Sequence, residues 1–254
     1  MKILLTNDDG IFAPGLAAIY KELARLGDVT VVAPTESCSG ASHSVTIDYP
    51  LVCNKVNIEG KFSGYSVQGL PADCVKLAAL KLHEGQIDLL VAGINNGANI
   101  GINVYYSGTV AAAMEGAFLK IPSVAMSMAT DEKMDYENAA GYCAEILKEL
   151  LPIERGYVIN INIPQLTKQK PKGIRVVPQS TQALLENYDH EQNEKGQTTF
   201  QLTSGMFRAE EHHNDVSSII EGFITITALT SDMTNYEKTA RLKEKIKSYK
   251  LDIK

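Results

Sequence analysis

The sequence predicts an α/β fold built on a mostly parallel β-sheet with helices on both faces. Short, continuous apolar runs, typical of buried parallel strands, alternate with segments whose apolar residues recur at helical spacing. The chain has 254 residues, of which 44% are hydrophobic, so a sizeable core is available. Alternating strand and helix signals indicate βαβ units, in which the helices cover both faces of the sheet.

The alternation is clearest up to Pro164. Lys2–Thr6 is a short β-prone run, Gly15–Leu26 has apolar residues at helical spacing, and Asp28–Ala33 is dense in valine. The same patterns recur further along the chain. We expect helices at Ala72–His83, Val110–Leu119 and Tyr136–Leu151, and strands at Ile87–Gly93, Ser123–Ser127 and Tyr157–Ile163.

After Pro164 the sequence becomes more polar and less periodic. The stretch from Gln182 to Asp215 has few apolar residues, so it cannot easily form a core of its own. We expect strands at Ile174–Pro178, Thr198–Leu202 and Gly222–Leu229, and a lysine-rich helix at Tyr236–Tyr249.

This change in composition predicts the domain organisation. Residues 1–181 are expected to form the core, with part of its sheet completed by residues 214–232. Residues 182–254 are expected to form an arm with a terminal helix. Because the arm lacks apolar residues for a core, it should pack on a neighbouring subunit or project from the molecule.

Composition and charge exclude several classes of protein. The chain has 24 Lys and Arg and 30 Asp and Glu, a net charge of −6, and no basic stripe that would suit duplex nucleic acid. No run of about 18 apolar residues and no secretory signal is evident, so we expect a cytoplasmic protein without a membrane contact. The four cysteines form no C-x-x-C pair and are expected to be free thiols. The P-loop, G-x-G-x-x-G and G-x-S-x-G motifs are absent.

Two neighbouring carboxylates, Asp8 and Asp9, follow the first predicted strand. In open parallel sheets, ligands bind beyond the carboxyl ends of strands. Adjacent carboxylates repel each other, and a hard cation such as Mg²⁺ or Mn²⁺ between them would relieve the repulsion. The same residues suit a turn in which an aspartate caps the next helix. The residues alone leave the metal site and the turn as equal alternatives.

Serine, asparagine and glycine residues follow two other predicted strands. Ser39 and His43 lie in a Ser/Gly-rich loop at Ser37–Ser44, which by itself is more typical of a flexible loop than of a site. Asn95 and Asn96 belong to a run of three Asn and three Gly. Asparagine offers a neutral oxygen to a hard metal and an amide donor to a phosphate. Because buried asparagines are costly without partners, this segment favours a functional role.

A fourth segment, Tyr105–Val110, opens a predicted helix. Ser107, Gly108 and Thr109 place small residues at its N-terminus, where unpaired N–H groups and the helix dipole can bind a phosphate. An ordinary N-cap explains the same residues. The phosphate interpretation gains weight because all four segments fall at the same edge of the predicted sheet.

Together the segments resemble the SurE survival-protein family of metal-dependent, acid-phosphatase-like 5′-nucleotidases. The matching motifs, which occur in order and cover nearly the whole chain, are TNDDGIFAPG (Thr6–Gly15), SGASHSVT (Ser39–Thr46), PADCV (Pro71–Val75), GINNGANIG (Gly93–Gly101) and YYSGTVAAAMEG (Tyr105–Gly116), with a weaker match at Asp215–Leu229. The sequence departs from the family pattern at Leu70, Cys38 and Ala228, where Thr, a longer polar residue and Pro are expected.

The resemblance implies a Rossmann-like core and a C-terminal arm that is exchanged between subunits of a homodimer or homotetramer. It also implies one divalent metal ion per subunit, Mg²⁺ or Mn²⁺. The metal ligands it implies are Asp8, Asp9, Ser39 and Asn95. The phosphate-binding residues it implies are Asn96, Ser107, Gly108 and Thr109.

The implied activity is hydrolysis of nucleoside 5′-monophosphates to nucleoside and phosphate, with 3′-nucleotides and short polyphosphate as further substrates. Asp8, Asp9 and Asn96 are the expected catalytic residues, and His43 is a candidate proton shuttle. The metal would polarise the phosphoryl group and activate water, with attack by Asp8 as the second choice. A nucleotide sensor and a structural oligomer stay open as alternatives that need no catalysis.

Overall fold

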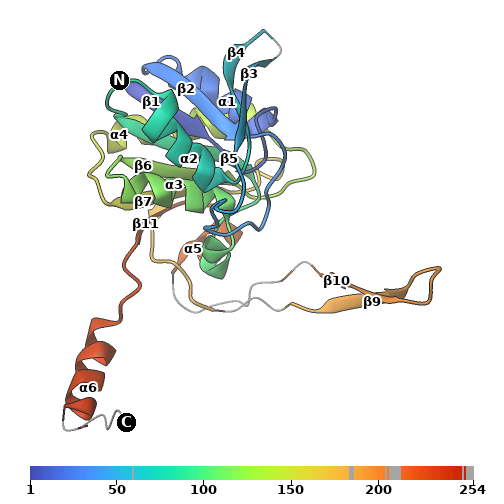
Figure 1. Ribbon diagram of the computed structural model, residues 1–254, viewed down its shortest axis with the longest axis vertical. Coiled ribbons are helices and arrows are strands. Elements are labelled where there is room, and N and C mark those ends of the chain that lie inside the picture. The colour runs from blue at the N-terminus through green and yellow to red at the C-terminus, as the bar shows by residue number, and fades with distance from the viewer. Residues whose placement is uncertain (59, 183–185, 204, 206–212, 248, 250–254) are drawn as a thin grey trace.

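The computed structural model describes residues 1–58, 60–182, 186–203, 205, 213–247 and 249. Its centre is a nine-stranded sheet in the order β3-β4-β2-β1-β5-β6-β7-β11-β8 (Figure 1). A separate two-stranded ribbon pairs β10 with β9. The strands are β1 Lys2–Thr6, β2 Asp28–Pro34, β3 Val52–Ile58, β4 Phe62–Gln68, β5 Leu89–Asn96, β6 Ser123–Met128, β7 Tyr157–Ile163, β8 Ile174–Val176, β9 Tyr188–Gln192, β10 Thr198–Leu202 and β11 Ile224–Thr230.

The sheet is mostly parallel. The six strands from β4 through β2, β1, β5 and β6 to β7 all run in the same direction. Antiparallel pairings occur only toward the edges of the described sheet, where β3 pairs with β4 and β11 pairs with β7. The chain builds outward from β1 to β2 and β4 and then restarts on the other side of β1 with β5. The order therefore reverses between β1 and β5, and such a reversal opens a crevice beyond the strand ends.

Helices cover both faces of the sheet, as the sequence predicts (Figure 1). Successive residues of β1 point to opposite faces, so Ile3 and Leu5 pack in one core cluster and Leu4 in the other. The first cluster contains buried residues of α1 and α4, and the second contains those of α2 and α3. The helices are α1 Pro14–Leu23, α2 Pro71–Leu77, α3 Gly108–Phe118, α4 Tyr136–Leu150, α5 Asp215–Ile220 and α6 Tyr236–Ile246.

Several boundaries differ from the expected ones. The hairpin of β3 and β4 has no counterpart in the sequence prediction, because β3 is mostly exposed and lacks a continuous apolar run. Strand β5 starts at Leu89 rather than Ile87 and continues to Asn96. Asn95 and Asn96 therefore belong to the end of the strand. The helix expected at Ala72–His83 is α2 followed by a wider π-type turn at Ala78–Leu82. Strand β9 and helix α5 were also unexpected, because their sequences are polar or short.

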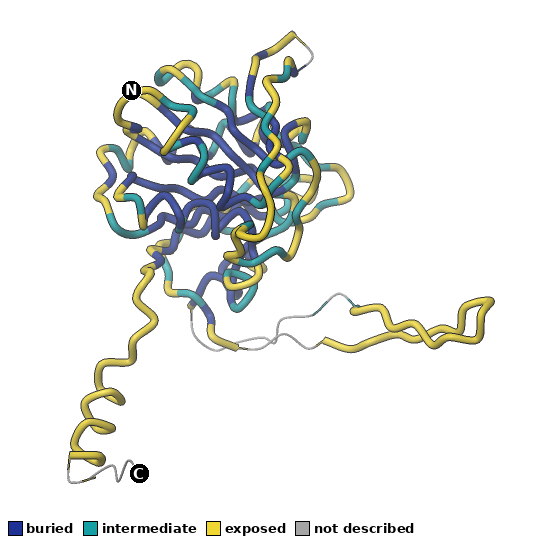
Figure 2. The backbone as a smooth tube through the Cα atoms, viewed as in Figure 1, coloured by how far each residue is buried: buried dark blue, intermediate teal, exposed yellow. Residues whose placement is uncertain are grey.

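Two segments of the C-terminal region project from the core. The β9–β10 ribbon and helix α6 extend away from the body and consist of exposed residues (Figures 1 and 2). Parts of the expected arm, residues 183–185, 204, 206–212, 248 and 250–254, lie outside the described residues. No described helix is both long and apolar enough to cross a bilayer. All four cysteines are free.

Candidate functional site

The polar segments singled out in the sequence follow strands or open helices at the carboxyl edge of the sheet. The turn after β1 carries Asp8 and Asp9, the end of β5 carries Asn95 and Asn96, and α3 begins at Gly108. Because β1 and β5 are the neighbours at which the strand order reverses, these segments face the crevice where α/β proteins bind ligands.

The Asp8 carboxylate is buried against the first turn of α3. Its Oδ2 accepts a hydrogen bond from the Thr109 N–H at 3.1 Å, and its Oδ1 accepts one from the Thr109 hydroxyl at 2.5 Å. A Cβ atom added at Gly108 would lie 2.9 Å from Asp8 Cβ and 3.0 Å from its Oδ2. The close approach of helix and carboxylate therefore requires glycine at this position.

The Asp9 carboxylate lies against the end of β5. Its Oδ2 accepts a hydrogen bond from the Asn96 N–H at 3.0 Å. The turn that holds it is tightened by a hydrogen bond of 2.9 Å from the Asn7 side-chain amide to the Gly10 carbonyl, with Gly10 at a φ of 101°. The two adjacent carboxylates are thus held by two different elements, α3 and β5.

The electrostatics of the pair are unfavourable in the protein alone. Burial raises the pKa of Asp8, and the Asp9 charge raises it further, while the hydrogen bonds from Thr109 lower it. Burial also raises the pKa of Asp9, against the lowering effect of the Asn96 N–H. Among the described residues neither carboxylate forms an ion pair. A cation bound to the two carboxylates would therefore not compete with a basic side chain of the described residues.

Asn95 precedes the residue whose N–H binds Asp9. The Asn95 amide nitrogen donates to the Gly97 carbonyl at 2.7 Å, which fixes the amide and leaves its Oδ1 available to a ligand. In the described part of the chain, no three His, Cys, Asp or Glu side chains gather as a metal-binding group. Carboxylate, amide and hydroxyl oxygens of the kind carried by Asp8, Asp9, Asn95 and Ser39 suit Mg²⁺ or Mn²⁺ better than zinc.

The Ser/Gly-rich loop is anchored next to Asp8. The Cys38 N–H donates to the Asp8 carbonyl at 2.7 Å, which places Ser39 one residue from the acidic turn. The exposed Ser39 hydroxyl shares a hydrogen bond of 3.1 Å with Ser37. Further along, the Thr46 N–H and hydroxyl bind the buried Asp73 carboxylate at 2.9 and 2.7 Å.

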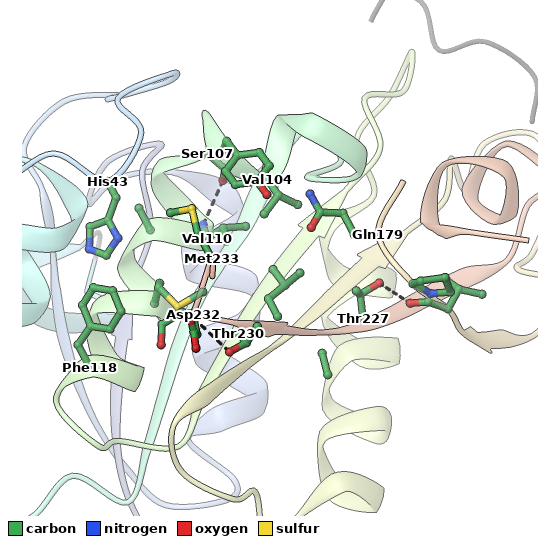
Figure 3. Close-up of a pocket in the computed structure, with 18 of the residues that line it drawn as sticks. His43, Val104, Ser107, Val110, Phe118, Gln179, Thr227, Thr230, Asp232 and Met233 are labelled. Carbon is green, nitrogen blue, oxygen red and sulfur yellow. Dashed lines mark hydrogen bonds between the residues drawn. The ribbon is translucent and has the colours of Figure 1, made fainter. Parts of the chain in front are cut away.

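The N-terminus of α3 has the N-cap that its sequence predicts. The Ser107 hydroxyl caps the helix by accepting from the Val110 N–H at 3.0 Å (Figure 3). Its hydroxyl hydrogen can still donate to a ligand, because capping uses only an oxygen lone pair. Thr109 presents its N–H and hydroxyl to Asp8, so its bonds orient the carboxylate.

His43 is bound away from the acidic pair. Its Nε2 lies 2.9 Å from the buried carboxylate of Glu115, which also pairs with Lys76 at 2.9 Å. The ring stacks on Phe118 with centroids 5.1 Å apart, at the wall of a cavity of about 620 Å³ (Figure 3). Its contacts are with the middle and end of α3, whereas Asp8 contacts the start of that helix.

Sequence reasoning missed several buried polar residues behind the site. Asn160 and Asn162 of β7 point into the fold and hold the loop after β5: the Asn99 carbonyl accepts from both side-chain amides, and the Asn99 N–H donates to Asn162 Oδ1 at 2.7 Å. Asp215 accepts from the Gly101 N–H at 2.9 Å. The alternation of Asn with Ile in β7 was the available signal, since a buried strand rarely carries unpaired amides.

Comparison with known proteins gives one consistent result. The family model described as survival protein SurE matches residues 3–186. A protein of Syntrophus aciditrophicus (strain SB) named 5′-nucleotidase SurE is 40% identical over 247 residues, which are 96% of this chain and 93% of the relative. A protein of the same name from Desulfitobacterium hafniense (strain DSM 10664 / DCB-2) is 42% identical over 97% of both chains.

A solved structure agrees with these relatives. The crystal structure of the SurE protein from Aquifex aeolicus superposes with a TM-score of 0.83 at 37% sequence identity. The match covers 96% of this chain and 99% of that one. The likeness therefore extends over the core and most of the C-terminal region.

Proposed function

This chain belongs to the SurE family, and on that premise we propose that it is a 5′-nucleotidase whose phosphate site lies at the β1–β5 crevice. The observation that carries the placement is the buried acidic pair, held by Thr109 of α3 and Asn96 of β5. A nucleoside 5′-monophosphate is a phosphoric monoester, and its dianion needs positive charge and N–H donors. The start of α3 supplies the donors, and a cation at the acidic pair supplies the charge.

The residues present fit a divalent metal ion. Asp8 and Asp9 offer two carboxylates whose mutual repulsion a cation would relieve, and Asn95 and Ser39 offer neutral oxygens beside them. We assign these residues as the ligands of one Mg²⁺ or Mn²⁺ ion per subunit. When bound, such an ion polarises the phosphoryl group and makes a water molecule more acidic.

The residues around the pair position the substrate. Asn96 has an exposed side chain at the carboxyl end of β5, where its amide can donate to a phosphoryl oxygen. Ser107 can donate its hydroxyl hydrogen, and the backbone at Gly108 and Thr109 lies at the positive end of α3. We assign Asn96, Ser107 and Gly108 to direct phosphate contact. Thr109, whose N–H and hydroxyl donate to Asp8, belongs to the phosphate site through the position it gives that carboxylate.

Water is the proposed nucleophile. Both oxygens of Asp8 accept hydrogen bonds from Thr109, and these bonds reduce the electron density that a nucleophilic carboxylate would need. Trapping of labelled phosphate on Asp8 would contradict this assignment. The proposed proton-shuttle role of His43 requires movement, because the ring is paired with Glu115. Hydrolysis of 3′-nucleotides and short polyphosphate belongs to the same proposal, since both offer a terminal phosphoryl group.

Phosphate release from adenosine 5′-monophosphate (AMP) tests the proposed function. We expect hydrolysis with Mn²⁺ or Mg²⁺ and loss of hydrolysis with a chelator, because the phosphate dianion would otherwise meet two uncompensated carboxylates. A panel of 5′- and 3′-monophosphates and tripolyphosphate, each assayed with several divalent ions, defines the substrate range. Binding of AMP without phosphate release above a protein-free blank would favour the nucleotide sensor instead.

We further propose that residues 182–254 form an arm exchanged between the subunits of a homodimer or homotetramer. Helix α6 has no buried residue, yet its Leu242 and Ile246 are large apolar side chains 59% and 63% exposed. The segment leading to it passes the apolar cavity of Figure 3 at Asp232 and Met233. A second copy of the chain would cover both surfaces.

Substitution of the apolar face of α6 tests the exchange. The double variant Leu242→Asp, Ile246→Asp is expected to shift the full-length protein from dimer or tetramer to monomer, because each charge would have to be desolvated at the interface. Glu244→Lys, about 160° away from Leu242 around the helix, changes the charge without touching this face and is the matched control. Sedimentation velocity at micromolar concentration is the measurement. A wild-type monomer would contradict the proposal.

A further inference from the structure

A second cavity, of about 570 Å³, lies at the carboxyl ends of β2 and β4. It is lined by the loop that follows β2, by the segment before β3, and by the residues that lead from β4 into α2. Its size is that of a small-molecule site. Its walls combine an acidic side chain, Glu36, an aromatic ring, Tyr49, and an amide, Gln68.

This cavity shares a wall with the acidic turn. Cys38, which lines it, donates its N–H to the Asp8 carbonyl at 2.7 Å. Gly10 follows Asp9 in the same turn, and a Cβ atom added there would lie 3.4 Å from the carbonyl carbon of Glu36. The backbone of Glu36 and Cys38 therefore packs directly on the segment that carries the two carboxylates. A substrate with its phosphate at the start of α3, beside the acidic turn, has this cavity as a neighbour.

The position of Glu36 suits recognition of a sugar. Strand β2 neighbours β1 on the side away from β5 and ends at Pro34, and Glu36 follows it at the carboxyl edge of the sheet. In doubly wound folds, an acidic residue in this region accepts hydrogen bonds from ribose hydroxyls while the phosphate lies at a helix N-terminus. The Glu36 side chain is exposed, and its carboxylate forms no hydrogen bond or ion pair with the described residues. Both of its oxygens can accept from a ligand.

Tyr49 offers a stacking surface in the same cavity. It is 64% exposed, and an exposed aromatic ring at the wall of a polar cavity is suited to the π-face of a base. The larger apolar cavity of Figure 3 is less suitable for the nucleoside. Ser107 brings that cavity next to the proposed phosphate site, but two of its polar wall groups are already engaged. His43 pairs with Glu115, and Asp232 accepts hydrogen bonds from Thr234 and Tyr236.

We propose that the cavity between β2 and β4 binds the nucleoside part of the substrate, with Glu36 accepting hydrogen bonds from the ribose hydroxyls and Tyr49 stacking on the base. This inference rests on the proposed 5′-nucleotidase function and adds to it the residues that determine substrate preference. Because Glu36 is negatively charged, it also disfavours a second phosphate on the 3′-oxygen of the ribose.

Four substrates separate these contacts: AMP, 2′,3′-dideoxy-AMP, ribose 5-phosphate and p-nitrophenyl phosphate, assayed with Mn²⁺ on the full-length protein. For Glu36→Gln we expect kcat/KM for AMP and ribose 5-phosphate to fall about tenfold more than for the two substrates that lack the ribose hydroxyls. For Tyr49→Ala we expect the two adenine nucleotides to lose about tenfold more than the two substrates without the base. Tyr49→Phe keeps the ring and should restore the wild-type preference.

The controls distinguish this cavity from the other one. Met233→Ala, in the cavity of Figure 3, should leave the ratio of AMP to p-nitrophenyl phosphate hydrolysis at its wild-type value. A selective loss of AMP hydrolysis in Met233→Ala, or equal losses on all four substrates in Glu36→Gln and Tyr49→Ala, would overturn the inference.

Failure of the proposed function gives a different result. If the wild-type protein does not hydrolyse AMP, the 5′-nucleotidase proposal fails, and calorimetric titration with adenosine still tests the cavity. Weaker adenosine binding by Glu36→Gln and Tyr49→Ala than by the wild type would support the nucleoside site. Equal binding by all three proteins would overturn it.

Discussion

Asp9→Asn is expected to lower kcat/KM for AMP by at least about 100-fold while the protein stays folded. The variant removes one of the two charges that would hold the divalent ion. It keeps an oxygen that can accept from the Asn96 N–H, the bond of 3.0 Å that positions this side chain. The change is therefore in charge rather than in shape. Steady-state hydrolysis of AMP with Mn²⁺, and Mn²⁺ affinity measured by calorimetry, are the readouts.

The same variant is expected to be more stable than the wild type when no metal is present at pH 7. Burial raises the pKa of both carboxyls above the ordinary value of 3.8, so the folded state holds these protons more tightly than the unfolded state. The tighter proton binding stabilises the folded state. This contribution to the free energy of unfolding is fully present below the ordinary pKa and is lost as the pH rises through the raised pKa. Asn at position 9 removes one of these titrations and the repulsion that acts on Asp8.

Thermal unfolding with and without Mn²⁺ checks this reasoning. We expect Mn²⁺ to raise the Tm of the wild type more than that of Asp9→Asn. In metal-free buffer, the difference by which the Tm of the variant exceeds that of the wild type should shrink as the pH is lowered toward 4. Unchanged turnover together with unchanged Mn²⁺ affinity would show that the acidic pair is only a turn.

Gly108→Ala is also expected to have a large effect, and the effect is on AMP hydrolysis more than on the formation of α3. The added methyl group would lie 2.9 Å from Asp8 Cβ, closer than real Cβ contacts allow, so either the carboxylate or the start of α3 has to move. A displacement of about 1 Å at a catalytic centre can cost about 100-fold in rate. We therefore expect kcat/KM for AMP to fall by about that factor.

Gly141→Ala is the matched control for this substitution. Gly141 lies in α4, and nothing lies within 4 Å of the Cβ that would be added there. The variant should gain up to about 1 kcal/mol of stability from helix propensity and hydrolyse AMP like the wild type. Urea unfolding and AMP hydrolysis of both variants separate the two effects. Wild-type activity in Gly108→Ala would contradict the packing of Asp8 on α3.

The elements that carry strong local patterns could be predicted. Strands β1 and β7 were expected at the residues where they occur, because β1 carries a run of apolar residues and β7 is rich in the β-branched residues Val and Ile. The neighbouring carboxylates Asp8 and Asp9 were recognisable for a similar reason, since two charges directly after such a strand stand out from the apolar sequence before them. Local sequence also indicated the helix that begins near Ser107.

Contacts between distant residues could not be predicted in this way. His43 was a candidate proton shuttle, and its pairing with Glu115, 72 residues further along the chain, leaves no mark in the local sequence. Asp73 anchors the Ser/Gly-rich loop through Thr46, although its own sequence context suggests only a helix start. The β3–β4 hairpin forms an edge of the sheet, and β3 is mostly exposed with its apolar residues interrupted by Asn and Lys, so it lacks a continuous apolar run.

By itself, the sequence determined which strands and helices form the centre of this protein and which short polar segments follow them, because apolar periodicity and helix-start residues act over a few neighbouring positions. Only the tertiary structure decided which of those segments meet. The packing of strands and helices brings Asp9 to Asn96, Asp8 to Thr109 and His43 to Glu115. Sheet order is set by packing between residues far apart in the chain, which local patterns do not encode.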